Sequence, residues 1–360
     1  MRIVKVKLGN RGYEIRIGRD LLGHVGTWLR EKMAGDKVVI VTNPVVDNLH
    51  GDSLKRGLDK SGFKPAVLLV PEGEEQKSLD TAARLYARMQ SVHAERSTPV
   101  IALGGGVIGD LAGFVAATYM RGLPLVSLPT TLLAQVDSSI GGKTAVDHGP
   151  IKNNIGVFHQ PMLVIADTYT LNSLPPLEVS NGMAEVIKYA VIQDCEFFSL
   201  LEKNLDRVRS FDNTLLEEVI VRSATIKARI VEKDEKDTGL RNTLNFGHTV
   251  GHALESASDY RMKHGQAVAV GMVTAAVISN KLGIFPAKDL MRLKNLLMEA
   301  GLPVGVPRLD IARIIKAMEH DKKIHNGKIK FILPRKIGKV FVSDNVSFAL
   351  AIEVLEGNNA

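Results

Sequence analysis

The chain has 360 residues, a length that predicts about two domains, each large enough to bury its own core. Hydrophobic residues make up 45% and charged residues 24%, the composition of an ordinary globular protein. Cys195 is the only cysteine, which excludes a disulfide within the chain and fits a reducing, cytoplasmic location.

The net charge of +7 is compatible with a nucleic-acid surface or with a cleft that attracts a small anionic substrate. Basic residues are mixed with acidic ones, as in 232–241, and aromatic residues are only 5%, so stacking platforms for bases are scarce. The first ten residues lack the apolar core of a signal peptide, and the longest apolar run, 267–278, is too short to span a bilayer. We therefore expect a small anionic ligand, no nucleic acid and no membrane.

The first half of the chain alternates short apolar runs with helical patterns. The runs 4–8 and 13–18 flank a glycine-containing turn and predict a hairpin. Further strands are predicted at 37–42, 66–70, 99–104 and 124–129, with helices around 45–60, 78–92 and 107–118. This alternation indicates a parallel sheet covered on both faces.

The pattern changes after residues 171–180, where a Pro-Pro pair is typical of a linker. Helices are predicted at about 178–203, 212–233, 246–258, 264–281, 286–300 and 308–318. The predicted fold class is therefore α/β, with an N-terminal parallel-sheet domain (1–172) followed by an α-helical C-terminal domain (173–360). A cleft between two domains is the default place for a ligand.

A glycine-rich turn follows the strand at 99–104. Gly104, Gly106 and Gly109 satisfy G-x-G-x-x-G, with a helix N-terminus available to a pyrophosphate. A tight strand-to-helix turn needs glycines for its own sake, so the motif alone is weak. The acidic residue expected about 20 positions later is missing, and Asp110 follows the glycines instead.

The segment 71–78 follows the strand at 66–70, at the edge where open α/β sheets bind ligands. Glu74 and Lys77 are suited to the polar edges of a nucleotide, although a charged turn before a helix would look the same.

The segment 129–147 is denser in polar groups than a buried segment normally is, and buried polar groups demand partners that a bound anion would supply. Its polar residues are Thr130, Thr131, Asp137, Ser138, Ser139, Lys143 and Thr144. Lys152 and Asn153 follow in 149–156 and add a positive charge and an amide suited to phosphate or carboxylate.

A carboxylate and three histidines mark the second half. Glu185 and Lys188 lie in an apolar helix and either form an ion pair or serve a metal. His248 and His252 are four positions apart on one helix face, and His264 precedes another apolar helix. One carboxylate with two or three histidines is typical of a catalytic zinc site, but the spacing leaves open whether His248 and His252 both bind the ion.

Together these segments resemble the 3-dehydroquinate synthases of the sugar-phosphate cyclase superfamily, over almost the whole chain. The resemblance rests on PEGEEQKS, GGGVIGDLAGF, YMRG, PTTLLAQVDSSIGGKTAV, KNNIGVFHQP, GMAEVIKY, GLRNTLNFGHTVGHALE, HGQAVAVGM, DKK and FILP.

This resemblance implies a Rossmann-like first domain and an NAD- and metal-dependent phosphate lyase of the shikimate pathway, which leads to chorismate and the aromatic amino acids. It implies conversion of 3-deoxy-D-arabino-heptulosonate 7-phosphate to 3-dehydroquinate and phosphate, with zinc or cobalt as the metal. It also implies a homodimer in which Arg121 reaches the neighbouring subunit's site.

The resemblance also assigns residues. The implied metal ligands are Glu185, His248 and His264, which leaves His252 on the substrate side. The implied NAD contacts are Asn43, Glu72, Gly73, Glu74, Lys77, Gly105, Gly106, Val107, Ile108, Gly109, Asp110, Thr130, Thr131, Lys143, Lys152, Thr170 and Ser173. The implied catalytic and substrate-binding residues are Arg121, Asp137, Lys143, Lys152, Asn153, Lys188, Lys227, Arg241, Asn245, His252 and one of Lys322 and Lys323.

The chain departs from the family pattern at three positions. Gln266 stands where Glu is usual, Asp147 where Asn is usual, and Ile151 where Gly is expected. We expect the first to alter the surroundings of His264. The rival interpretations are another sugar-phosphate cyclase and a metal-dependent polyol dehydrogenase of the same superfamily. The lysine-rich phosphate site argues against the dehydrogenase.

Overall fold

The computed structural model describes residues 1–149, 151–306, 311–320, 324–325 and 328–357. By their contacts the residues form two compact units, Met1–Pro175 with Asn213–Glu232 and Pro176–Asp212 with Lys233–Ala360. The first unit thus takes in a later stretch of the chain, while the predicted domain boundary after residue 172 stays a prediction. Within the described part of the chain, no helix is long and apolar enough to cross a membrane.

The first unit is built on a seven-stranded sheet with the order β1-β2-β9-β6-β5-β3-β4. β1 pairs antiparallel with β2, which forms the predicted hairpin, and the remaining neighbours pair in parallel. The strands are β1 (Arg2–Val6), β2 (Tyr13–Gly18), β3 (Lys37–Thr42), β4 (Lys64–Leu69), β5 (Val100–Gly104), β6 (Leu125–Pro129) and β9 (Leu163–Asp167). The predicted α/β fold is confirmed, although β9 was not predicted.

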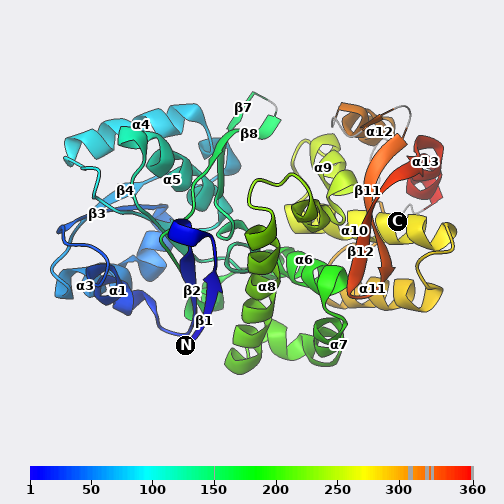
Figure 1. Ribbon diagram of the computed structural model, residues 1–360, viewed down its shortest axis with the longest axis horizontal. Helices are drawn as coiled ribbons and strands as arrows, with labels where there is room; N and C mark the ends of the chain where they lie inside the picture. The colour runs from blue at the N-terminus through cyan, green and yellow to red at the C-terminus, as the bar shows by residue number, and fades with distance from the viewer. Residues whose placement is uncertain (150, 307–310, 321–323, 326–327, 358–360) are drawn as a thin grey trace. The chain divides into compact units, whose positions relative to one another are not determined.

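Helices cover both faces of this sheet (Figure 1). They are α1 (Val25–Arg30), α3 (Asp52–Lys60), α4 (Leu79–Ser91) and α5 (Gly106–Thr118). Successive residues of a strand point to opposite faces, so Val39 and Val41 pack with residues of α4 and α5. Val38 and Ile40 pack with residues of α1 and α3 instead. The central strands are apolar throughout because neither face meets water.

The first unit also contains a second, two-stranded sheet and a helix from later in the chain. The polar segment 129–147 leads into an antiparallel pair, β7 (Lys143–His148) and β8 (Ile151–Phe158), which was not predicted. The helix α8 (Asn213–Lys233) belongs to this unit through residue 232. The carboxylate of its Glu232 accepts a hydrogen bond of 2.7 Å from the backbone N–H of Lys7, just beyond β1.

The second unit contains the helices predicted for the second half of the chain other than α8. They are α6 (Pro176–Gln193), α7 (Cys195–Arg209), α9 (His248–Ala257), α10 (His264–Lys281), α11 (Ala287–Glu299) and α12 (Ile311–His320). The prediction of one helix over 178–203 was wrong, because Asp194 interrupts it and caps α7 by accepting a 2.9 Å hydrogen bond from the backbone of Phe197. A three-stranded antiparallel sheet follows, β10 (Ile324–His325), β11 (Lys328–Lys336) and β12 (Lys339–Ser347), and then α13 (Phe348–Gly357). This sheet was not predicted.

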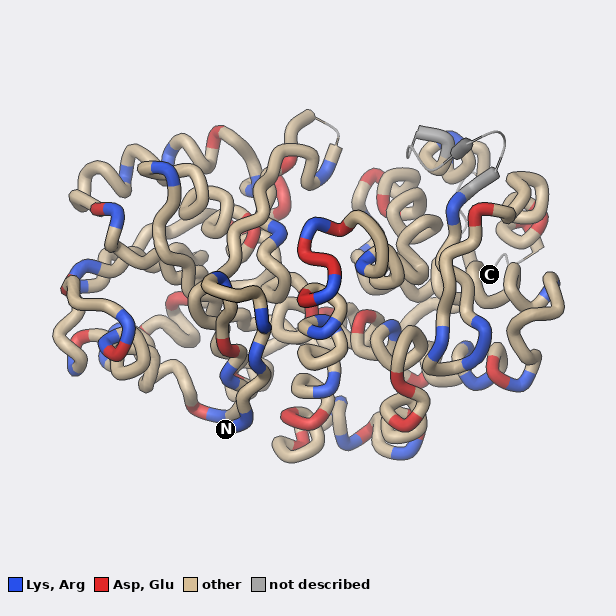
Figure 2. Tube along the Cα trace, viewed as in Figure 1, with Lys and Arg blue, Asp and Glu red and all other residues tan. Residues whose placement is uncertain are grey.

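The charged residues keep the mixed pattern that the sequence shows. Lys and Arg alternate with Asp and Glu along the trace of each unit (Figure 2).

Glycines bring α9 and α10 into close contact. A Cβ on Gly271 of α10 would lie 1.9 Å from the carbonyl oxygen of Gly247 and 3.0 Å from the backbone nitrogen of Gly251. Gly247 itself has φ +83°, a left-handed conformation that ordinary side chains disfavour. These glycines fix the start of α9, where His248 stands.

We expect Gly271→Ala to lower the free energy of unfolding by about 1–3 kcal/mol, because the added methyl overpacks the contact with the backbone of α9. Thermal and denaturant unfolding measure the change. Gly35→Ala is the matched control, since a Cβ there meets nothing within 4 Å and φ is not positive. Equal stability of both variants would contradict the close approach of the two helices.

Candidate metal and nucleotide sites

Glu185 is a carboxylate in the middle of an apolar helix. Residues 181–192 of α6 are buried all round, and Glu185 itself is 0% exposed. Lys188, one turn later and also buried, forms an ion pair with it. The sequence left open whether Glu185 and Lys188 form an ion pair or serve a metal. The ion pair is present, and it does not exclude a metal. Both charges are shielded from water, where electrostatic attraction to a further charged partner is strong.

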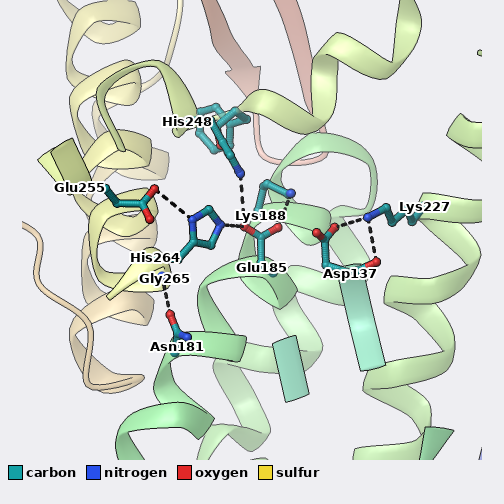
Figure 3. A network of polar contacts seen from close by, with 10 residues as sticks. Asp137, Asn181, Glu185, Lys188, Lys227, His248, Glu255, His264 and Gly265 are labelled. Atoms are coloured by element: carbon teal, nitrogen blue, oxygen red, sulfur yellow. Dashed lines mark hydrogen bonds and ion pairs between the residues drawn. The ribbon is translucent and has the colours of Figure 1, made fainter. Parts of the chain in front are cut away.

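Two histidines from other helices of the same unit approach Glu185 (Figure 3). His248 is the first residue of α9, and its Nε2 lies 3.6 Å from Oε1 of Glu185. His264 is the first residue of α10, and its Nε2 lies 3.4 Å from the same oxygen. One ligand atom from each of the three residues lies within 4.8 Å of the other two.

These separations fit a metal ion. Ligand atoms about 2.1 Å from a tetrahedral zinc lie about 3.4 Å from one another. Two imidazole nitrogens and one carboxylate oxygen are also a donor set typical of catalytic zinc, which leaves one coordination position open. The residues present therefore fit the metal that the sequence predicted, while their role as ligands stays a prediction.

The other ring nitrogens are also held. His248 Nδ1 lies 3.1 Å from the carbonyl oxygen of Phe246, and His264 Nδ1 lies 3.2 Å from Oε2 of Glu255. Both partners accept hydrogen bonds, so the two Nδ1 atoms carry protons and Nε2 of each ring is turned toward Glu185. Glu255 was missed in the sequence because its partner is nine residues away, on the next helix.

The two imidazoles differ in charge. Burial and the nearby Lys188 ammonium hold the pKa of His248 well below its usual range, so its ring is neutral at pH 7. Burial also disfavours the charge on His264, but hydrogen bonds to Glu185 and Glu255 outweigh it and raise its pKa to about 10. A metal binding to His264 must therefore displace a proton.

His252 lies on α9 one turn beyond His248 and is exposed. Its ring centroid is 5.3 Å from that of His248 and 6.3 Å from that of His264. With Glu255 and His264 it forms a second group whose ligand atoms lie within 4.8 Å of one another. Among the described residues, two sets of three candidate ligands therefore share His264.

Gln266, one of the three departures, serves the backbone. Its Oε1 accepts a 3.2 Å hydrogen bond from the N–H of Lys263 and caps α10. The start of α10 is also held by Asn181 of α6, whose side chain accepts a hydrogen bond from the N–H of Gly265.

In the first unit, the glycine-rich turn joins β5 to α5 as predicted. Gly105 is the N-cap of α5, so the free N–H groups of its first turn are available to an anion. A Cβ on Gly109 would meet nothing within 4 Å, although glycine weakens a helix by about 1 kcal/mol. The open space beside this backbone fits a nucleotide phosphate.

A pocket adjoins this turn, entirely within the first unit. Predicted polar residues line it, and so do residues that the sequence did not single out. The lining is Gly104, Gly105, Gly109, Asp110, Leu125, Ser127, Pro129, Ala134, Ser138, Ser139, Gly142, Lys143, Thr144, His159 and Pro161. The glycine turn and the polar segment 129–147 therefore share one cavity.

Lys77 contacts Asp110 and Asn153, and its charge is also stabilised by Glu74. It is buried, its Nζ lies 2.6 Å from Oδ2 of Asp110, and it donates a hydrogen bond to the side chain of Asn153. Burial alone would lower the pKa of Lys77, but Asp110 and Glu74 raise it above its usual range, so it stays charged. Nearby, Lys152 Nζ lies 3.6 Å from Oε1 of Glu74.

Asp147 supports this network from β7. Its Oδ1 accepts a 2.7 Å hydrogen bond from the backbone N–H of Asn153, whose φ is +55°. The departure at residue 147 thus holds the first part of β8, which carries Lys152 and Asn153.

Two predicted substrate residues pair with each other in the first unit. Nζ of Lys227 on α8 donates 2.8 Å hydrogen bonds to Oδ1 and the carbonyl oxygen of Asp137. Lys227 is buried, and Asp137 lies in the short helical segment Ala134–Ser138.

A loop organised by Asp234 holds Arg241 and Asn245 in the second unit. The Asp234 carboxylate accepts backbone hydrogen bonds from Thr238, Gly239 and Arg241, and the first of these is the largest reason that its pKa falls to about 2. Arg241 is buried and donates a 2.7 Å hydrogen bond to the carbonyl oxygen of Glu235. Asn245 ends the helical turn Leu240–Asn245 that follows.

Of the remaining predicted residues, Thr130 and Thr131 adjoin the glycine-rich turn: the N–H of Thr130 donates a 3.0 Å hydrogen bond to the carbonyl oxygen of Gly104, and a Cβ on Gly105 would lie 3.0 Å from Cγ2 of Thr131. Arg121 is exposed with φ +68°, Asn43 caps the helix Pro44–Val46, and Ser173 Oγ lies 3.0 Å from Nε2 of the buried His50. Thr130 and Thr170 are buried and Thr131 is half-buried, whereas Glu72 and Gly73 are exposed. Lys322 and Lys323 lie outside the described residues.

Comparison with known proteins matches both halves of the chain to one family. The model for the N-terminal part of 3-dehydroquinate synthase matches residues 67–181, and that for the C-terminal part matches residues 182–324. A curated 3-dehydroquinate synthase from Dehalococcoides mccartyi (strain CBDB1) is 49% identical over 356 residues, covering 99% of each chain.

Solved structures of related enzymes share the fold. A 2-deoxy-scyllo-inosose synthase complexed with carbaglucose-6-phosphate, NAD+ and Co2+ superposes with a TM-score of 0.90 at 28% identity, covering 99% of this chain and 100% of that one. A 2-epi-5-epi-valiolone synthase from Streptomyces hygroscopicus subsp. jinggangensis 5008, with NAD+ and Zn2+ bound, gives 0.89 at 26% identity and covers 99% of each chain.

The two ligand sets that share His264 make different predictions for metal content. If Glu185, His248 and His264 bind the ion, His248→Ala loses it, whereas His252→Ala retains close to one equivalent. Atomic emission on protein desalted after zinc loading measures this, with circular dichroism as the check on folding. Metal retained in His248→Ala and lost in His252→Ala would place the ion with Glu255 instead.

Proposed function

Because the chain belongs to the 3-dehydroquinate synthase family, we propose that it converts 3-deoxy-D-arabino-heptulosonate 7-phosphate to 3-dehydroquinate and inorganic phosphate. The observation that carries this proposal is the convergence of Glu185, His248 and His264 in a chain that matches these synthases from end to end. The enzyme is a phosphate lyase that uses NAD and a divalent metal.

The rival interpretations have less support. The solved structures of other sugar-phosphate cyclases are 26–28% identical to this chain, against 49% for the curated dehydroquinate synthase. A simple polyol dehydrogenase has no need for lysines and arginines that bind phosphate, which Lys152, Lys227 and Arg241 would supply here.

NAD, when bound, supplies a hydride acceptor and donor within one turnover, and the metal supplies a Lewis acid that lowers the pKa of a substrate alcohol. Glu185, His248 and His264 would hold the metal. Phe246 and Glu255 orient the two imidazoles through Nδ1, so that their Nε2 lone pairs face the ion. His252, one turn along α9 and exposed, would lie on the substrate side of the site.

The first unit would hold NAD. The free N–H groups at the start of α5 suit its pyrophosphate, and the missing side chain at Gly109 leaves room for it. Glu74 and Lys77 follow β4 at the carboxyl edge of the sheet, where open α/β folds bind nucleotides.

Charged residues of the chain would bind the two anionic groups of the substrate. Arg241, Lys188 and Lys227 are buried, so their attraction to a carboxylate or phosphate is weakly screened. Charge builds on the phosphate as its C–O bond breaks, and preorganised cations stabilise that charge without having to move. Imidazole accepts and donates protons near neutral pH, a role that suits His252.

We also propose a homodimer and a cytoplasmic location. Arg121 lies in an exposed turn in which Met120 also has positive φ, so the turn presents a cation and an apolar side chain to a possible second copy. The single cysteine suits a reducing compartment. Sedimentation velocity would contradict the dimer if the loaded protein ran as a monomer.

Catalytic use of NAD gives a testable stoichiometry. We expect phosphate release in many-fold excess over NAD while NADH absorbance stays near zero, because the hydride returns to the product within each turnover. Parallel assays of phosphate and of absorbance, with NAD and metal each withheld as controls, measure this. NADH accumulating in proportion to substrate consumed would instead favour the dehydrogenase.

A further inference from the structure

The ring of His264 lies between two carboxylates. Its Nε2 faces Oε1 of Glu185 at 3.4 Å, and its Nδ1 faces Oε2 of Glu255 at 3.2 Å (Figure 3). Glu255 is only 7% exposed, and a carboxylate with so little access to water needs a positive or hydrogen-bonding partner. His264 Nδ1–H is such a partner.

Residues other than Glu255 hold the backbone on both sides of His264. At one end of the link between α9 and α10, Ser258 accepts hydrogen bonds from the N–H of Met262 and, through its carbonyl, from Arg261. At the other end, Asn181 holds the N–H of Gly265. The contact between Glu255 and Nδ1 is made by the ring itself and therefore bears on the rotation and tautomer of the imidazole.

The second imidazole has a weaker partner. His248 Nδ1 faces a neutral acceptor, the carbonyl oxygen of Phe246, at 3.1 Å. A carboxylate on the far nitrogen of a ligand imidazole makes that imidazole a stronger donor than a carbonyl does. The two imidazoles of the site are therefore unequal, and His264 is the stronger donor.

We propose that Glu255 is a positioning residue of the metal site: it keeps the proton on Nδ1 of His264, aims Nε2 at the metal and strengthens His264 as a ligand. This inference rests on the proposed function, in which Glu185, His248 and His264 hold the ion. The alternative is that Glu255 is itself a metal ligand. Because Glu255 faces Nδ1, that ion would bind Nδ1 of His264 while the proposed ion binds Nε2. Binding metal through both nitrogens would require His264 to be an imidazolate.

The test is the dissociation constant for zinc, measured by competition with a chelator. Glu255→Gln keeps the shape and a hydrogen-bond acceptor but removes the charge, and we expect it to weaken zinc binding by about 10-fold or more, within the 10–100-fold range for such partners. Glu178→Gln is the matched control. Glu178 pairs with Lys263, 2.9 Å away and next to His264, and it accepts a 3.2 Å hydrogen bond from Asn181 that a glutamine can still accept.

A spectroscopic readout separates ligand strength from a general structural effect. The visible bands of bound Co2+ should shift in Glu255→Gln and stay unchanged in Glu178→Gln, because only the first alters a ligand's donor strength. If Glu255→Gln does not fold, Glu255→Asp keeps the charge, withdraws it from Nδ1 and should also weaken zinc binding.

The outcomes are distinct. Equal zinc affinity in wild type, Glu255→Gln and Glu255→Asp would overturn the inference. So would two zinc ions per wild-type chain with one lost in Glu255→Gln, since Glu255 would then be a ligand. Glu185→Gln separates the inference from the proposed function, because zinc binding at wild-type strength in that variant would refute the proposed site itself.

Discussion

The second unit depends on a carboxylate that has no access to water. Removing a carboxylate from water costs several kcal/mol unless opposite charge compensates it. Glu185 lies in the buried, largely apolar helix α6, where it pairs with the ammonium of Lys188. The imidazoles of His248 on α9 and His264 on α10 also approach it, and that of His264 is charged. A divalent cation would complete this compensation and would explain why a helix otherwise suited to a hydrophobic core carries Glu185.

Close helix packing brings the candidate ligands together. His248 and His264 each begin a helix, and those helices approach closely because glycines replace side chains between them. Each histidine ring is then fixed by a hydrogen bond that its Nδ1–H donates, to a carbonyl oxygen for His248 and to a carboxylate for His264. In the first unit, glycines serve a different purpose, since the space at Gly109 is left open beside the free N–H groups of α5.

Local pattern predicted most of the fold. Apolar runs and helical periodicity located the strands of the central sheet and most helices, because those elements bury a regular face. The pair β7 and β8 was missed because β8 is largely exposed and lacks apolar alternation. β11 was missed because Pro334, a residue that disfavours strands, stands inside it next to a register irregularity.

Residue type and resemblance predicted the candidate ligands, but not the side chains that support them. The supporting contacts join Glu255 to His264, Asp234 to Arg241 and His50 to Ser173. Nothing in the sequence immediately around the three supporting residues marks this role, because the fold or a loop brings the partners together. The same holds for Lys77 and Asp110, whose ion pair joins positions 33 residues apart (110 − 77) in different elements. Such contacts become visible only once the tertiary structure is known.

X-ray absorption at the zinc edge tests the central claim most directly, because it counts ligands by type around the ion itself. In protein loaded with one zinc per chain, the account predicts two imidazoles at about 2.0–2.1 Å, with the remaining ligands oxygen and no sulfur. A third imidazole would place His252 on the metal. That result would contradict the account, in which His248 binds the metal and His252 acts on the substrate.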